Sequence, residues 1–267
     1  MHPFDKAITL KLMDDGRFRG QTSPDYANMI GPFGGTTAAS LLQAAMQHES
    51  RIGDPIALTV NFAAALADGD FDISCRPVRT NRSTQHWSLE LIQAGEVAAS
   101  ASAVFALRRD TWSAPEAVPP EMPSAHTLAP LPSGASVKWV SRYEMRFERG
   151  GLPVHQDSEM QNNSETRMWI RDEPARPLDF VSLAALCDSF FPRIFVRRRK
   201  FVPMGTVSLT TYFHADAALL LKQGDRPVLG VAQAKSFRNG YFDQAAEIWS
   251  DDGQLLANSN QIVYYRE

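Results

Sequence analysis

The chain has 267 residues, of which 44% are hydrophobic and 21% charged, and its net charge at pH 7 is −3. This composition predicts a well-filled core in one large domain or two small ones, and the slight negative charge argues against nucleic acid as the main partner. No apolar run approaches the roughly 20 residues of a membrane span, and the first ten residues do not look like a signal peptide.

Cysteine and histidine usage narrows the possible chemistry further. The two cysteines lie in a strand-like run (Cys75) and in an apolar helix (Cys187), which favours reduced thiols in the cytoplasm over a disulfide framework. No pair among the six histidines has the spacing of metal ligands. We therefore expect neither a metal nor a cofactor.

The first half is expected to contain one helix and several antiparallel strands. A strand over residues 7–13 leads into the turn Asp14-Asp15-Gly16. The pair Gly34-Gly35 then precedes a helix of small residues that ends near Gln47, with Thr36 or Thr37 as its cap. Four strand-like runs follow, at residues 56–64, 71–78, 84–93 and 97–107. One helix covering an antiparallel sheet is an α+β arrangement.

The second half repeats this order after a proline-rich connector over residues 113–136. Strands are expected at 137–147 and 165–171, then a helix after Pro177, then strands at 206–214, 228–237, 242–250 and 255–265. The ends of the two halves align with one offset, because 253 − 95 and 266 − 108 both equal 158 for the pairs Gly253/Gly95 and Arg266/Arg108. The sequence thus predicts two copies of one unit, at residues 1–112 and 137–267.

Three polar residues occur in the second copy alone. Asp188 lies near the end of the apolar helix, Gln261 stands where the first copy has Ala103, and Thr206 corresponds to Pro55. A carboxylate in apolar surroundings costs several kcal/mol unless hydrogen bonds compensate it, so Asp188 needs partners. Two alternatives stay open at this point. Asp188 could lie just beyond the helix and face water, and Thr206 and Gln261 could each be hydrogen-bonded independently of it.

Nearly the whole chain resembles the acyl-CoA thioesterase II family, through the motifs FGGTTAASLLQA, LAALCDSFFP, TVSLTTYFH and LLANSNQ. The resemblance implies a double hotdog, in which each tandem unit wraps a curved antiparallel sheet around one central helix. It also implies that Asp188, Thr206 and Gln261 hold and activate the water that hydrolyses an acyl-CoA thioester. The segment TVSLTT lacks the acidic and histidine residues often found after this threonine in the family, which leaves substrate choice open.

Further candidates surround this set. Backbone N–H groups near Gly35 could stabilise an oxyanion, since they begin a helix. The densest run of positive charge could receive the phosphates of coenzyme A, although such runs are commonly solvated surface; it comprises Arg193, Arg197, Arg198, Arg199 and Lys200. Aromatic residues that could line an acyl pocket, or equally well pack the core, are Phe190, Phe191 and Tyr212.

Two other functions compete with thioester hydrolysis. A hotdog dehydratase or hydratase would use an Asp/His pair, for which only His214 is available. A non-catalytic acyl-binding protein would not need the polar trio. Cys187 is a poor nucleophile candidate because its flanks are apolar.

Exposed sheet edges also predict a homo-oligomer, a dimer or larger. The acyl chain length and the choice between coenzyme A and a carrier protein cannot be predicted from these residues.

Overall fold

The computed structural model describes residues 1–132, 137–152 and 159–267. One antiparallel sheet runs through both halves, in the order β1-β2-β4-β5-β6-β3-β9-β13-β12-β10-β8-β7, with β11 paired to β12 alone. The strands are β1 Lys11–Leu12, β2 Phe18–Gln21, β3 Asp54–Phe62, β4 Asp70–Thr80, β5 Thr84–Gln93, β6 Glu96–Ala106, β7 Tyr143–Arg149, β8 Thr166–Asp172, β9 Met204–Phe213, β10 Val228–Gln233, β11 Phe237–Arg238, β12 Tyr241–Trp249 and β13 Leu255–Tyr265. The helices are α1 Pro3–Ala7, α2 Gly34–Gln47, α3 Phe180–Leu186, α4 Arg193–Arg198 and α5 Ala217–Gln223, with short 3₁₀ turns η1 Pro24–Tyr26, η2 Ala125–Thr127 and η3 Lys138–Arg142.

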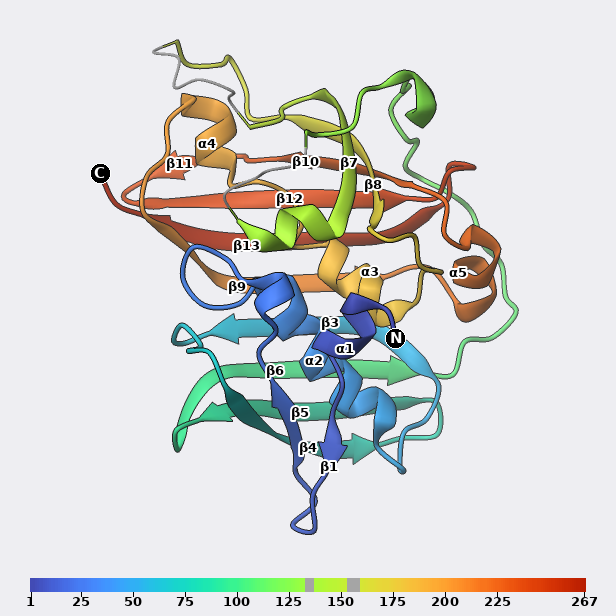
Figure 1. Ribbon diagram of the computed structural model, residues 1–267. Helices are drawn as coiled ribbons and strands as arrows, with labels where there is room; N and C mark the ends of the chain where they lie inside the picture. Colours follow the sequence, from blue (N-terminus) through green and yellow to red (C-terminus); the bar gives the residue numbers. More distant parts are fainter. Residues whose placement is uncertain (133–136, 153–158) are drawn as a thin grey trace.

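The two halves are built alike and meet at one seam (Figure 1). From the edge to the seam the first half reads β1-β2-β4-β5-β6-β3, and the second reads β7-β8-β10-β12-β13-β9. At the seam β3 pairs with β9, and the hydroxyls of the facing residues Thr59 and Thr210 lie 3.0 Å apart. This α+β arrangement confirms the predicted double hotdog. The unit limits at residues 112 and 137 stay a prediction.

Helix α2 fills the first half with small side chains. Four alanines and two leucines of α2 are fully buried, which allows the helix to lie close to the sheet and to α3. Its N-cap is Phe33, which supplies no side-chain cap. The predicted cap was wrong, because the Thr36 hydroxyl donates a hydrogen bond to the Phe33 carbonyl instead of accepting one from the helix start. The first N–H groups of α2 are therefore open to a partner from elsewhere in the chain.

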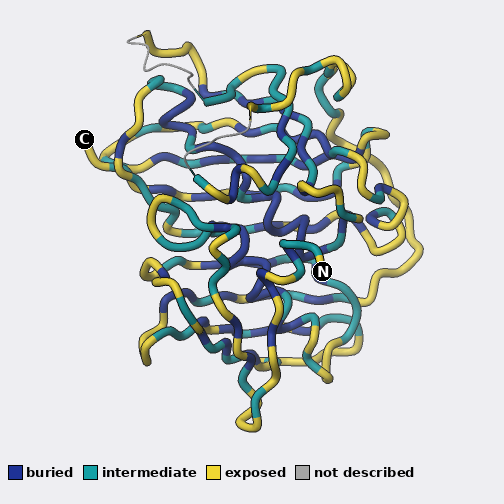
Figure 2. Tube along the Cα trace, viewed as in Figure 1, coloured by how far each residue is buried: buried dark blue, intermediate teal, exposed yellow. Residues whose placement is uncertain are grey.

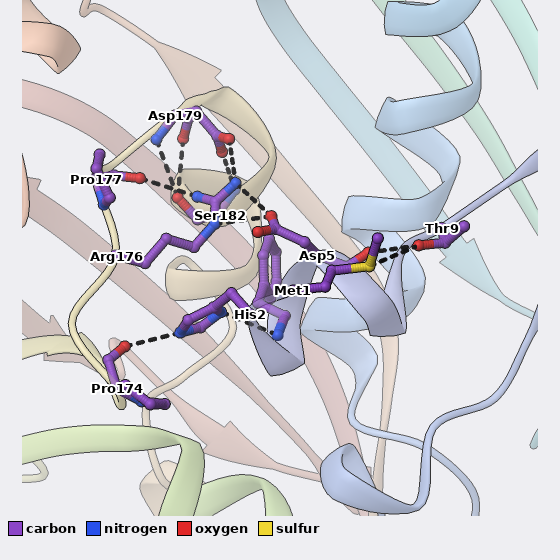
Figure 3. A network of polar contacts seen from close by, with 10 residues as sticks. Met1, His2, Asp5, Thr9, Pro174, Arg176, Pro177, Asp179 and Ser182 are labelled. Atoms are coloured by element: carbon purple, nitrogen blue, oxygen red, sulfur yellow. Dashed lines mark hydrogen bonds and ion pairs between the residues drawn. The ribbon is translucent and has the colours of Figure 1, made fainter.

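Helix α3, in contrast, begins with its own cap. Asp179 and Ser182 form a reciprocal capping box, a motif worth about 1 kcal/mol. Arg176 joins Asp179 to Asp5 of α1 (Figure 3). Its guanidinium also lies 5.2 Å from the centre of the Phe4 ring. The N-terminal helix is thereby fixed against the start of α3.

Some elements differ from the prediction. Helix α1 was not anticipated, and the strand expected over residues 7–13 is shortened to β1. Residues 138–142 form η3, so β7 begins only at Tyr143. Helix α5 was not anticipated. The connector has no regular structure over residues 107–124 and is mostly exposed (Figure 2), while its last residues, 133–136, lie outside the described part. Among the described residues, no helix is long and apolar enough to cross a membrane.

Candidate active site

Asp188 lies directly after helix α3, which is shorter than the apolar run of the sequence suggests. The helix ends at Leu186 with Cys187 as its C-cap, and the Asp188 N–H still bonds to the Ala185 carbonyl at 3.1 Å. Asp188 is thus just beyond the helix, as one of the alternatives proposed. Its carboxylate does not simply face water, however, because the N-terminus of α2 lies against it.

The start of α2 contacts this carboxylate through two glycines. A side chain on Gly34 would place its Cβ only 2.7 Å from Asp188 Oδ2, and one on Gly35 would meet the Ala185 carbonyl at 2.7 Å. Since both glycines lack a Cβ, the helix can approach α3 this closely. The positive end of the α2 dipole therefore stabilises the negative charge of Asp188. Gly34 is a site residue that sequence reasoning did not single out, because its contact with Asp188 joins two distant parts of the chain.

Gln261 connects the carboxylate to the sheet. Its Nε2 donates a hydrogen bond to Asp188 Oδ1 at 2.8 Å, and two residues earlier Ser259 Oγ donates to the Cys187 carbonyl at 3.3 Å. Both side chains are buried on the inner face of β13. Strand β13 thus fixes the position of Asp188.

Thr206 reaches the same site through an irregularity in its strand. Thr206 pairs with Val263 and Ser208 with Ile262, so Val207 is an extra residue in β9. This β-bulge turns Thr206 to the inner face, whereas regular alternation would place it outside with Ser208. The Thr206 hydroxyl then lies 3.5 Å from Gln261 Oε1. This distance is too long for a strong hydrogen bond, so both atoms can still bind a third group.

The environment of Asp188 changes its acidity. Burial raises its pKa to about 7, although the hydrogen bond from Gln261 and the interaction with the Gly35 N–H oppose this shift. Asp188 and Thr206 are half-buried rather than fully enclosed, so solvent reaches them. A carboxylate with this pKa can accept a proton near neutral pH.

The oxyanion role predicted for Gly35 is not supported, whereas the expectation that Cys187 is not a nucleophile agrees with the structure. The Gly35 N–H interacts with the Asp188 carboxylate, which makes it a poor candidate for an oxyanion donor. Cys187 is fully buried, and burial raises the pKa of its thiol to about 12, so the nucleophilic thiolate is not formed at neutral pH. His214, the partner that a dehydratase would need, is exposed and bonds to Asn258 at 2.7 Å.

The structure corrects two assignments among the predicted binding residues. Arg193 is completely buried and its guanidinium is bonded internally, so it is not a coenzyme A ligand in this structure. Tyr212 is 46% exposed, between the buried residues Thr211 and Phe213. Because Phe213 contacts Phe180 of α3, Tyr212 lies on the outer face of the sheet and not in an acyl pocket.

The remaining candidates are placed in two regions. Phe190 and Phe191 are buried in the second half, where Phe191 stacks on Phe147 at 5.6 Å between ring centres. Arg197 and Arg198 are half-buried on α4, Lys200 is exposed, and Arg198 pairs with Glu267. Arg199 lines a polar cavity of about 370 Å³ between α4, the end of β7 and the segment before β8, and none of Asp188, Thr206 and Gln261 lines this cavity.

Comparison with known proteins identifies the family. Residues 23–106 match the model of the acyl-CoA thioesterase N-terminal domain, and residues 115–265 match that of the C-terminal domain. No curated protein sequence matches the chain closely enough to count as a relative.

Solved structures agree with this fold along the whole chain. A hot dog fold protein of unknown function from Alicyclobacillus acidocaldarius is 47% identical, with a TM-score of 0.93 over 100% of this chain and 99% of that one. A putative thioesterase II from Thermobifida fusca is 18% identical, with a TM-score of 0.83 over 99% of both chains. An acyl-CoA thioesterase II from Mycobacterium marinum is also 18% identical, with a TM-score of 0.77 over 98% of both chains. The chain therefore belongs to the acyl-CoA thioesterase family and is a thioester hydrolase.

Proposed function

We propose that this protein hydrolyses acyl-CoA thioesters with a water molecule activated by Asp188, Thr206 and Gln261. The observation that carries the proposal is the arrangement of Gln261. Its amide donates to Asp188 Oδ1 from one end, while its oxygen faces the Thr206 hydroxyl 3.5 Å away at the other. Three separate elements thus bring a base, a hydroxyl and an amide oxygen to one half-buried place that solvent reaches.

The chemistry follows from these roles. Asp188 accepts a proton from the water while the water oxygen attacks the thioester carbonyl carbon, and the carbonyl electron pair moves to the oxygen. Thr206 and the Gln261 oxygen hold the water in line for this attack. Collapse of the oxyanion breaks the carbon–sulfur bond, and the coenzyme A thiolate takes up the proton from Asp188. The products are a free acid and coenzyme A.

A free-thiol release assay over acyl-CoAs of increasing chain length tests this function. We expect hydrolysis of at least one chain-length class at a rate well above the spontaneous reaction. An acyl carrier protein thioester carrying the same acyl group is the control for the coenzyme A portion. Release from the carrier protein alone would overturn the assignment of acyl-CoA as substrate.

The basic segment after the site yields a prediction about substrate binding. Replacing Arg197, Arg198 and Arg199 by alanine should raise KM for acyl-CoA and leave kcat nearly unchanged. Phosphate contacts far from the reacting carbon stabilise the ground and transition states equally, and they weaken with added salt. Steady-state kinetics at low and high ionic strength provide the measurement.

A matched control removes the same charge elsewhere. Arg76, Arg79 and Arg82 are exposed on the first copy, so their triple alanine variant should not change KM. An equal KM change in both triple variants would indicate a general charge effect and contradict a role of α4 in coenzyme A binding.

The internal repeat predicts one active site per chain, although the fold occurs twice. In the first copy Ala103 replaces Gln261, and Leu58, its partner on β3, is buried. A site there would lack the amide that orients the base. Calorimetric titration with a non-hydrolysable acyl-CoA analogue should therefore saturate at one ligand for each chain. Two equal and independent sites would contradict this interpretation of the repeat.

The two cysteines bear on where the protein is located, and one exposed face of the sheet bears on its assembly. Cys75 and Cys187 are both free and buried, which supports the expected reducing cytoplasm. The outer face of β9 and β13 exposes Tyr212, Ile262 and Tyr264 by 38–46% each. We propose that the protein forms a homo-oligomer of two or more chains.

A further inference from the structure

A second glutamine lies beside Gln261 on the inner face of the sheet. In the pairing of β12 with β13, Gln244 is directly opposite Gln261. Both side chains are buried, with exposed fractions of 3% and 6%, so they share the face that carries Asp188. Residues opposite one another on neighbouring antiparallel strands have Cβ atoms about 5 Å apart. Gln244 is therefore a direct neighbour of the proposed catalytic amide.

The orientation of the Gln244 amide is fixed by Arg193. The Arg193 Nε donates a hydrogen bond to Gln244 Oε1 at 2.8 Å. Because a guanidinium can only donate, the amide oxygen must face Arg193 and the NH₂ group must point away from it. Sequence reasoning assigned Arg193 to substrate phosphates, but its complete burial and this contact give it an internal role.

Arg193 itself is held rigidly. Its Nη1 donates to the Ser164 carbonyl at 2.8 Å and to Thr166 Oγ1 at 2.7 Å, and its Nη2 donates to the Phe191 carbonyl. These acceptors are neutral. Burial lowers the pKa of Arg193 to about 9, so the group keeps its positive charge at pH 7. A fixed positive charge at the amide oxygen polarises the amide and strengthens its N–H groups as donors.

The Gln244 amide nitrogen differs from those of the other buried glutamines. Gln85 Nε2 donates to the Ser50 carbonyl, Gln223 Nε2 to the Arg226 carbonyl and Gln261 Nε2 to Asp188. Gln244 Nε2 donates to no residue within the described part of the chain, and it is not one of the side-chain atoms buried without a partner. Among the described residues, the Gln244 nitrogen is therefore a donor without a protein acceptor, on a side chain that is 3% exposed.

The first copy shows that the fold does not require an amide here. By strand pairing, the residue opposite Ala103 is Trp87, which is 1% exposed and fills the equivalent space. The pair Trp87/Ala103 thus corresponds to Gln244/Gln261 in the second copy. An indole and a methyl group pack a core, whereas two amides offer hydrogen bonds.

We propose that Gln244 donates a hydrogen bond from Nε2 to the carbonyl oxygen of the thioester and stabilises the oxyanion that forms there. Arg193 is the positioning residue that orients the amide. This inference rests on the proposed hydrolysis at Asp188. It supplies the oxyanion donor that Gly35, whose N–H faces Asp188, does not provide. A preorganised donor of this kind is worth about 10²–10³-fold in kcat.

The variant Gln244→Glu tests the proposal sharply. A glutamate keeps the acceptor for Arg193, so the fold is retained, but it removes the donor and brings negative charge to the oxyanion. We expect kcat to fall by at least ~100-fold with little change in KM, because the contact forms fully only in the transition state. Gln244→Met removes the donor without adding charge and should also lower kcat.

The control is Asn260→Asp, an amide-to-acid change on the exposed side of β13, next to Gln261 in the chain. It should keep wild-type kcat. Melting curves show which variants are folded. A folded Gln244→Met variant with normal kcat, or a Gln244→Glu variant that changes only KM, would overturn the role of Gln244 while leaving the proposed function intact. A wild-type protein that hydrolyses no acyl-CoA would overturn both.

The proposed role of Arg193 in orienting Gln244 can be tested separately. Arg193→Lys keeps the positive charge but loses the fork that holds Gln244 and the Phe191 carbonyl together. If Arg193 orients Gln244, this variant should lower kcat, and combining it with Gln244→Met should cause little further loss. Fully additive losses in the double variant would contradict the link between the two residues.

Discussion

Replacing Asp188 by asparagine should lower thioester hydrolysis by at least ~100-fold in a protein that remains folded, the scale expected for loss of a general base. Asparagine has nearly the same shape and can still accept the hydrogen bond that Gln261 donates to the carboxylate. It cannot accept a proton from water. Thiol release from an acyl-CoA, measured across pH, provides the assay.

The pH dependence gives this prediction a second test. Because burial raises the pKa of Asp188 to about 7, the wild-type rate should fall about tenfold for each pH unit below that value and level off above it. The residual activity of the asparagine variant should lack this step. Near-normal turnover by the folded variant would remove Asp188 from the mechanism.

Replacing Asp188 by asparagine should lower the activity but raise the stability of the protein at high pH. The pKa of Asp188 is higher in the folded state than its unfolded value near 3.8, so the group does not lower the free energy of unfolding below that pH. As pH rises from there to about 7, ionisation of Asp188 lowers the free energy of unfolding, by at most roughly 1.4 kcal/mol for each unit of pKa difference. The asparagine variant should therefore gain stability over wild type at pH 8 and show no gain near pH 4. Thermal unfolding at the two pH values measures this difference.

The repeat and the unusual carboxylate could be predicted from sequence because both depend on local patterns. The offset of 158 between Gly95 and Gly253 indicates the duplication, and Asp188 is conspicuous in an apolar run. The strand order of the structure confirms the duplication. The two central helices and most long strands follow from hydrophobic periodicity, while the end of α3 at Leu186 depends on tertiary contacts that periodicity does not report.

The geometry of the site could not be predicted in the same way. The bulge at Val207 decides which face Thr206 occupies, and a bulge shifts strand parity without a clear signal in the sequence. The partner of Asp188 at the start of α2 is some 150 residues away in the chain, and no local pattern joins them. The run from Arg193 to Lys200 contains five basic residues, yet only Arg193 among them is buried, because it lies with Ile194, Phe195 and Val196 in the buried first part of α4. Its role depends on Gln244, which the sequence analysis did not single out.

Substituting Gly34 by alanine should displace the Asp188 carboxylate while leaving the carboxyl group itself intact. The new methyl carbon would lie 2.7 Å from Asp188 Oδ2, which is too close, so the carboxylate has to move. It would lie 3.5 Å from Phe62 Cζ, which is an ordinary van der Waals contact. The Gly34 backbone is not left-handed, and alanine is a better helix former than glycine. We therefore expect little loss of stability and a fall in kcat of about 10-fold or more, since small displacements from attack geometry are costly.

The comparison variant is Gly151→Ala, whose added carbon would contact the Phe147 ring at 3.3 Å, away from Asp188. It should keep wild-type kcat. Alanine at position 34 also disturbs the approach of the α2 N-terminus, which lowers the pKa of Asp188 through the Gly35 N–H. The pH step of the variant should therefore move upward from about 7 as that opposing interaction weakens. If the variant kept both the wild-type kcat and the wild-type pH step, the carboxylate would not need its close contact with α2, and the start of this helix would serve packing alone.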